Sequence, residues 1–169
     1  QDAINVAVNG DEIIIGPGTY TGVGDSVVNP MSKRLWIHSS DGPEVTIIDG
    51  EGVRRGIQCA GGETSETIFE GLTITNGYAY KGGGMYNYDS SPALTNCTFA
   101  GNSATWVGGG MYNVDNSSPT LSDCMFAGNS SSDQGGGMYN DDYSSPTLEN
   151  CTFTGNSAGY YGGAGARAA

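Results

Sequence analysis

Apolar residues occur along most of this chain in clusters of one to three, separated by turns rich in Gly, Asn, Asp and Ser. From residue 82 onward the clusters repeat. The block GGGMYN begins at residues 82, 108 and 135, in steps of 26 and 27 residues. A fixed period of this length indicates an array of one repeated supersecondary unit.

Aligning the units extends the pattern toward the N-terminus and places the apolar residues in four columns. Two of the columns contain Val45, Phe69, Leu94, Leu121 and Leu148, and Ile48, Leu72, Cys97, Cys124 and Cys151. The other two contain Ile74, Phe99, Phe126 and Phe153, and Ile37, Ile57, Met85, Met111 and Met138. Four apolar positions per unit cannot close a globular core alone, but units stacked as a solenoid fill one continuous interior.

The segments around these columns are predicted to be short strands. They lie at residues 34–38, 45–48, 56–59, 67–69 and 72–74, with counterparts in each later unit. Helical repeats would need amphipathic runs of about ten residues, and none follows residue 8. The pattern therefore predicts an all-β fold, a parallel β-helix of about six to seven coils, right-handed as parallel crossovers generally are.

The start of the chain is predicted to cap this solenoid. Residues 1–8 form a short helix, and its apolar face contains Ala3, Ile4, Ala7 and Val8. A buried apolar strand over residues 13–15 follows, and the helix would cover the open edge of the first coil. We expect one domain, which divides into the cap (1–10), divergent coils (11–81), three regular repeats (82–161) and an incomplete coil or tail (162–169).

The charge balance narrows the range of partners. Asp and Glu number 18 against 6 Lys and Arg, a net charge of −12. Nucleic acids and anionic membranes are polyanions, so we expect neither as a partner. No run of about 18 apolar residues occurs, and we expect no membrane insertion.

The four cysteines could be disulfide partners or core residues. Cys97, Cys124 and Cys151 share one position of successive repeats, and Cys59 stands apart. Equivalent side chains of stacked parallel strands lie about 4.8 Å apart and point the same way. This arrangement fits the torsion of a disulfide badly. We therefore predict that the cysteines are small apolar residues of the core.

The opening QDAINVAVNGDEIIIGPGTYTG resembles the N-terminal cap and first coil of the right-handed β-helix superfamily that includes pectate lyases. The GGGMYN units resemble repeats of bacterial surface proteins of that superfamily, such as the polymorphic outer-membrane proteins. The resemblance covers residues 1–161 and implies a secreted protein, extracellular or at the cell surface, of a bacterium or archaeon. It implies no single activity, because the superfamily holds lyases, hydrolases and adhesins.

An enzyme of this fold would need a convergent set of acids and bases. A polysaccharide lyase uses a cation and a basic side chain that removes a proton. The predicted second coil has both kinds of charge, namely Lys33, Arg34, His38, Asp41, Glu44 and Asp49. A solvated surface explains this cluster better than a catalytic site, and we name no catalytic residue.

A column of carboxylates is predicted at one corner of the regular coils. Asp89, Asp115 and Asp142 each lie two residues after the asparagine of a GGGMYN block. Such oxygen-rich corners bind calcium, but turn aspartates also cap their own backbone. Both interpretations stay open, and no cofactor is required. The asparagines themselves, Asn87, Asn113 and Asn140, are predicted to form a hydrogen-bonded ladder.

A column of tyrosines is predicted on the outer surface. Tyr86, Tyr112 and Tyr139 follow the inward methionines, and strand alternation sends them outward. Exposed stacked tyrosines would offer a platform for a sugar ring or a partner chain. The alternative is an aromatic stack that only stiffens the strands.

These observations favour a non-catalytic extracellular β-helix with a structural or adhesive role. The predicted helix caps the front, and no rear cap is recognisable, so we expect either a longer protein or head-to-tail stacking into filaments. The partners would then be further copies of the chain or a cell-surface polysaccharide. The alternative is a carbohydrate-binding or polysaccharide-lyase-like β-helix.

Overall fold

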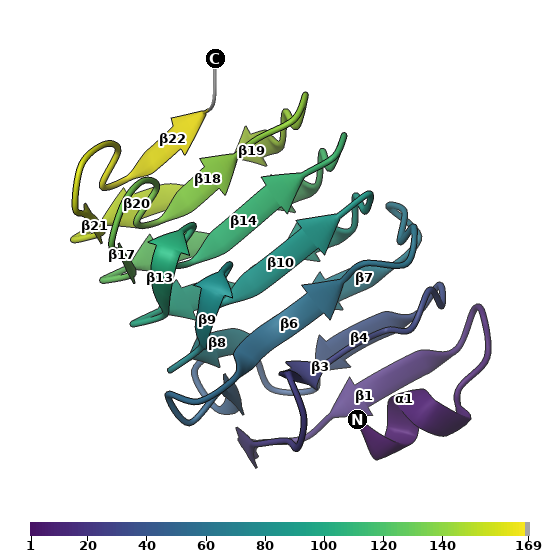
Figure 1. Ribbon diagram of the computed structural model, residues 1–169. Coiled ribbons are helices and arrows are strands. Elements are labelled where there is room, and N and C mark those ends of the chain that lie inside the picture. Colours follow the sequence, from purple (N-terminus) through teal and green to yellow (C-terminus); the bar gives the residue numbers. More distant parts are fainter. Residues whose placement is uncertain (168–169) are drawn as a thin grey trace.

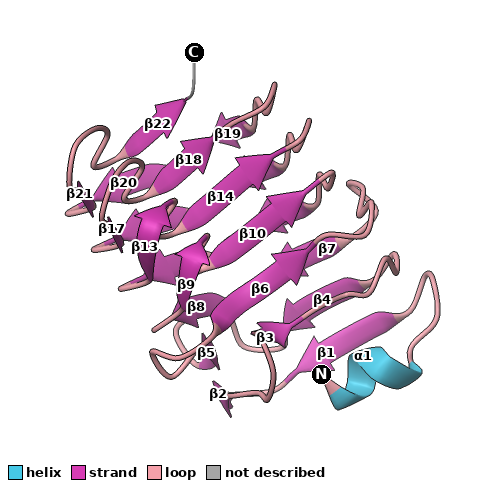
Figure 2. Ribbon diagram, viewed as in Figure 1, coloured by secondary structure: helices cyan, strands magenta, loops and turns pink. Residues whose placement is uncertain are grey.

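The computed structural model describes residues 1–167 and shows a rod of stacked coils (Figure 1). One short helix, α1 (Asp2–Val6), lies at the N-terminal end, and the remaining regular structure of the described residues is β-strand (Figure 2). The strands form four parallel sheets, which we call sheets A to D. No helix within residues 1–167 is long and apolar enough to span a membrane.

The strands of each sheet come from successive coils. Sheet A contains β1 (Glu12–Ile15), β4 (Trp36–Ser39), β7 (Ile68–Glu70), β11 (Ala93–Thr95), β15 (Thr120–Ser122) and β19 (Thr147–Glu149). Sheet B contains β2 (Gly18–Tyr20), β5 (Thr46–Asp49), β8 (Thr73–Thr75), β12 (Thr98–Ala100), β16 (Met125–Ala127) and β20 (Thr152–Thr154).

Sheet C has a strand in every coil, whereas sheet D begins only with β9. Sheet C contains β3 (Ser26–Val28), β6 (Arg55–Cys59), β10 (Met85–Tyr88), β14 (Met111–Val114), β18 (Met138–Asn140) and β22 (Gly165–Arg167). Sheet D contains β9 (Tyr78–Lys81), β13 (Ser103–Val107), β17 (Ser130–Ser131) and β21 (Ser157–Ala158). The predicted parallel β-helix is therefore confirmed. Six strands in a sheet are joined by five steps, so the described chain makes about five turns rather than the predicted six to seven.

Single residues with left-handed backbone make the corners between sheets A and B. Asn96, Asp123 and Asn150 each separate two strands and have φ angles of 50°, 54° and 53°. Asn and Asp accept this conformation more readily than other residues with a Cβ. The short strands and the sharp corners thus follow from the same turn-rich composition.

The repeated apolar residues point into the rod and stack in register. Leu94 pairs with Leu121 and Leu121 with Leu148, and the methionines of sheet C pair in the same way. The rings of Phe99, Phe126 and Phe153 stack with centroids 4.7 and 4.6 Å apart. Burial of these side chains is nearly complete in the central coils, and it decreases in the last coil. One continuous interior results.

The first coils are aligned differently from the prediction. Val45 was expected to begin the leucine column, but Val45 is exposed and Ile37 takes that place opposite Phe69. Ile48 was expected to begin the cysteine column, but it pairs with Ile74 and so begins the phenylalanine column. The alignment used apolar residues only, whereas one interior position of this coil is occupied by the polar residue Thr46. The buried Thr46 hydroxyl is hydrogen-bonded to that of Ser39 at 2.6 Å.

The front of the rod also differs in detail. Ile4 is buried and Ala7 packs against the core, as expected, but Val8 is exposed because the helix ends at Val6. The strand over residues 13–15 alternates instead of being fully buried, and its central Ile14 faces solvent. Of the predicted tail, residues 165–167 form β22 against β18, and residues 168–169 lie outside the described part.

Two ladders of asparagine side chains run through the coils. The predicted ladder is confirmed: the Nδ2 of Asn87 donates to Oδ1 of Asn113 at 2.7 Å, and Asn113 donates to Asn140 at 2.8 Å. A second ladder, which was not predicted, joins Asn102 to Asn129 at 2.9 Å and Asn129 to Asn156 at 3.0 Å. In the middle of each ladder, Asn113 and Asn129 hydrogen-bond through both the amide nitrogen and the oxygen to equivalent asparagines of the neighbouring coils.

All four cysteines are free thiols. Cys59, Cys97 and Cys124 are buried and Cys151 is half-buried. The three stacked thiols lie near backbone carbonyls; the Sγ of Cys97, for example, is 3.4 Å from the carbonyl of Thr95. Burial raises the pKa of the Cys59 thiol well above its usual range. The cysteines therefore serve as small residues of the core, as predicted.

Candidate functional site

The predicted tyrosine column lies on the outer face of sheet C, but it is not a free surface. Tyr86, Tyr112 and Tyr139 are in register, with ring centroids 5.7 and 5.8 Å apart. Tyr112 is only 1 % exposed and Tyr139 only 8 %. They form a second apolar cluster with Val107, the last residue of β13. The prediction of exposed tyrosines was wrong, because Val107 and Lys81, at the ends of β13 and β9, pack against the rings. Both strands lie beside the beginning of β10 and β14 (Figure 1).

Two of the few basic side chains complete this cluster. The guanidinium of Arg55 lies 4.8 Å from the Tyr86 ring centre and donates to the carbonyls of Lys81 and Gly82. The ammonium of Lys81 lies 4.4 Å from the ring centre of Trp106 and 4.9 Å from that of Tyr112. Burial lowers the pKa of Arg55. Both cations therefore hold sheet D against sheet C by these contacts.

The Tyr112 hydroxyl belongs to the same network. It accepts a hydrogen bond from the Lys81 ammonium at 3.3 Å and donates to Oδ2 of Asp141 at 3.2 Å. Burial, with the negative charge of Asp141, raises the pKa of Tyr112 well above its usual range. The hydroxyl stays protonated at all physiological pH values, so it acts as a structural donor and not as a base.

Another set of aromatic side chains, which are exposed, lies on sheet D and on the segments that follow its strands. Tyr80 and Trp106 stack with centroids 5.2 Å apart, and the Trp106 indole N–H donates to Oδ2 of Asp133 at 3.0 Å. The amide of Tyr160 in the next coil donates to the Asp133 carbonyl at 2.8 Å. We call Tyr80, Trp106, Asp133 and Tyr160 the aromatic stripe. Similarity between the repeats does not predict this stripe, although each member lies two residues before a glycine block.

The predicted carboxylate column has a role in the backbone. Asp89, Asp115 and Asp142 have φ angles of 45°, 58° and 42°, which are left-handed. They provide the turn that leaves sheet C, a conformation that Asp tolerates. No group of three or more His, Cys, Asp or Glu residues that could hold a metal ion occurs in residues 1–167. The three aspartates are therefore not gathered into such a group, and calcium binding at this column is left to be tested.

Removal of metal ions is expected to leave the stability unchanged. The strand ladders and the buried amide ladders hold the coils without a cation. The melting temperature should be the same in excess chelator and in millimolar calcium, as measured by circular dichroism. A rise in calcium that Asp115→Asn abolishes would contradict this prediction and restore the metal site.

The basic residues predicted on the second coil are bound separately and do not converge. Lys33 donates to the carbonyl of Ile4 at 2.6 Å, and Arg34 lies 3.4 Å from Glu66. His38 lies on the outer face of sheet A, where its Nε2 is 2.8 Å from Oε1 of Glu12 and its ring stacks on Trp36. The predicted neighbours Asp41, Glu44 and Asp49 make none of these contacts.

The surroundings of His38 raise its pKa above 6.5. Burial lowers it, but the hydrogen bond to Glu12, the carbonyl of Ser39 and the charges of Glu12 and Glu70 together outweigh that effect. A raised pKa means that the protonated ring stabilises the folded state below the unfolded pKa of about 6.5, and that this contribution is lost as the pH rises through the folded value.

Glu12→Gln is therefore expected to lower the pKa of His38. The ring protons of this single histidine can be followed by NMR between pH 5 and 9. The free energy of unfolding should also fall less steeply with rising pH in the variant than in the wild type. Glu66→Gln, which removes a nearby carboxylate that pairs with Arg34, is the control. Equal His38 titrations in the two variants would contradict the assignment to Glu12.

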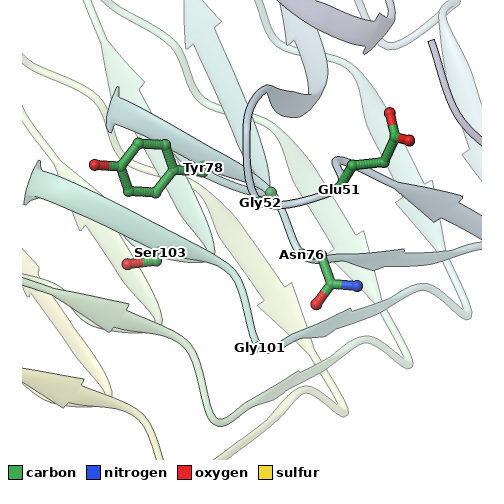
Figure 3. A pocket seen from close by; sticks show the side chains of 7 residues that line it. Glu51, Gly52, Asn76, Tyr78, Gly101 and Ser103 are labelled. Atoms are coloured by element: carbon green, nitrogen blue, oxygen red, sulfur yellow. The ribbon is translucent and has the colours of Figure 1, made fainter.

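One hollow lies at the corner between sheets B and D (Figure 3). It has a volume of about 310 Å³ and is lined by Glu51, Gly52, Asn76, Gly77, Tyr78, Gly101 and Ser103. Its labelled side chains spread around the glycines and do not point toward one another (Figure 3). Asn76 is bound to the carboxylate of Asp49 at 3.1 Å. The hollow thus presents no pair of acids or of acid and base.

Comparison with known proteins agrees with this architecture. A family model described as a right handed beta helix region matches residues 20–167. No curated protein and no solved structure matches the sequence.

Proposed function

The chain belongs to the right-handed β-helix family, and from this premise we propose that it is a non-catalytic extracellular rod that adheres to a polysaccharide. The aromatic stripe of sheet D would be the contact surface. The repeats themselves serve the fold, because their inward columns fill the interior and their tyrosines lie beneath sheet D.

The observation that carries this proposal is the placement of exposed aromatic rings along the rod axis. Tyr80, Trp106 and Tyr160 are solvent-exposed and come from three different coils. Coils are about 4.8 Å apart, so the stripe is a line and not a pocket. Aromatic rings beside a carboxylate suit the apolar and hydroxyl faces of a sugar, and a line of them suits an extended chain.

The charge of the protein selects among polysaccharides. With a net charge of −12 the rod repels polyanions, and Asp133 places one of these negative charges in the stripe itself. Uronate polymers are therefore unfavourable ligands, and neutral or basic polysaccharides are favoured. The same reasoning disfavours the lyase alternative, since its substrates are uronate polymers.

Trp106→Ala is expected to weaken polysaccharide binding by about tenfold or more, as the loss of a tryptophan anchor usually does. Binding can be measured by co-sedimentation with insoluble neutral polysaccharides, such as cellulose and chitin, and by affinity electrophoresis with soluble ones. Trp36→Ala is a closely matched control. Trp36 is 41 % exposed against 38 % for Trp106, and each indole donates to a carboxylate at 3.0 Å.

Equal loss of binding in both variants would show that the stripe is not the contact surface. If the wild type bound to none of the polysaccharides, the adhesive role itself would be rejected. Head-to-tail association of the rods stays a prediction that is independent of this test.

A further inference from the structure

The N-terminal end of the rod contains an apolar cavity of about 400 Å³. Ile13 and Ile15 of β1 form one wall, and Val27, Val28, Ile37 and Ile48 form others. Helix α1 lies over this end of the rod (Figure 1). The polar residues at the cavity are few, namely Gln1, Asp2, Tyr20 and Thr21.

The cavity lies at the end of one interior column and is open to solvent on one side. Tyr20 pairs with Ile48, so it occupies the column that Ile74 and Phe99 fill in later coils. Its side chain does not continue that stack. The Tyr20 hydroxyl instead donates to the carbonyl of Gly16 at 2.9 Å, and the ring is partly exposed. Tyr20, which is 38 % exposed, and Ile48, which is buried, both line the cavity at this end of the column.

The helix covers the end without filling it. The ammonium of Lys33 donates hydrogen bonds to the carbonyls of Ile4 and Asn5, at 2.6 and 3.2 Å. The side chain of Gln1 exchanges two hydrogen bonds with the backbone of Asn29, at 2.9 and 3.1 Å. These polar bonds fix the helix from the side, and Ile4 is the one helical side chain that is buried. The Lys33 anchor lies outside the cavity lining, whereas Gln1 takes part in both the anchoring and the lining.

We propose that this cavity is a binding site for a small, uncharged apolar molecule. An engineered apolar cavity of about 150 Å³ stays dry and binds benzene, so a cavity of about 400 Å³ suits a two-ring aromatic or a short aliphatic chain. Ligand pockets of this kind combine an apolar lining with a few polar groups. Asp2 at the cavity and the net charge of −12 disfavour fatty-acid carboxylates and other anions.

The test is titration of the protein with N-phenyl-1-naphthylamine, an uncharged fluorescent two-ring probe. We expect saturable binding of one probe per chain, and much weaker binding of anionic anilinonaphthalene sulfonate. Ile48→Phe should reduce the affinity at least about tenfold, because Ile48 lines the cavity and the larger Phe side chain would take up part of its volume. The control is Ile47→Phe, which adds the same ring one residue away and outside the cavity lining.

The outcomes distinguish the proposal from non-specific binding. Loss of binding in Ile48→Phe with retention in Ile47→Phe supports it, and Ile13→Phe provides a second filling variant if Ile48→Phe does not fold. Absence of saturable binding by the wild type would overturn it. Equal binding by a folded Ile48→Phe variant and the wild type would overturn it as well.

Discussion

Replacement of Gly109 by alanine is expected to destabilise the protein by about 4 kcal/mol or more, or to prevent folding. A Cβ at this position would collide with the backbone carbonyl oxygens of Ser130 and Gly136, the latter at 2.6 Å. Both obstacles are backbone atoms of the next coil, so neither can turn aside as a side chain would. The middle glycine of the block is therefore required for the close approach of one coil to the next.

The matched control is Gly128→Ala. Gly128 has a φ angle of +63°, and a Cβ built there meets no atom within 4 Å. Alanine at Gly128 should cost about 1–2 kcal/mol, the usual penalty for the left-handed conformation. Urea denaturation followed by circular dichroism measures both variants. Equal destabilisation would show that backbone conformation, and not the space between coils, explains the glycine block.

Asn129→Ala is expected to lower the free energy of unfolding by about 3–5 kcal/mol. The Asn129 side chain makes four hydrogen bonds, two by its oxygen and two by its amide nitrogen. Oδ1 accepts from the backbone and the side chain of Asn102, at 3.0 and 2.9 Å. Nδ2 donates to the carbonyl of Phe99 at 2.9 Å and to Asn156 at 3.0 Å. Alanine leaves these groups unsatisfied in the interior.

Asn113→Ala provides a graded comparison. Asn113 is equally buried, but its side chain makes two ladder bonds instead of four. We expect about half the loss of stability, because the cost of such changes follows the number of buried groups left without a partner. A greater loss in Asn113→Ala than in Asn129→Ala would contradict the assignment of stability to these bonds.

Where the repeat is regular, much of the structure could be predicted. The interior columns of Leu94, Phe99 and Met111 follow from the period, because parallel coils place equal residues opposite one another. In the first coils the prediction failed. There an inward threonine and an outward valine, Thr46 and Val45, reverse the usual relation between polarity and burial.

The candidate site could be predicted only in part. Strand alternation correctly places Tyr112 on the outside of sheet C, but the side chain is covered by residues of sheet D. The exposed rings of Tyr80 and Trp106 lie in a part of the repeat that has no common residue type, so similarity between units did not reveal them. The aspartate column was located correctly, but its carboxylates do not gather into a metal site.

The sequence by itself determined the fold class, the stacking of the regular coils and the asparagine ladder of the glycine blocks, because each follows from a constant period and a parallel register. Only the tertiary structure decided which outward residues are accessible and how the interior columns end. Whether an outward tyrosine meets solvent depends on another segment that crosses it, and whether a column is filled at its end depends on one side chain, Tyr20. Neither is encoded in the alternation of a single strand.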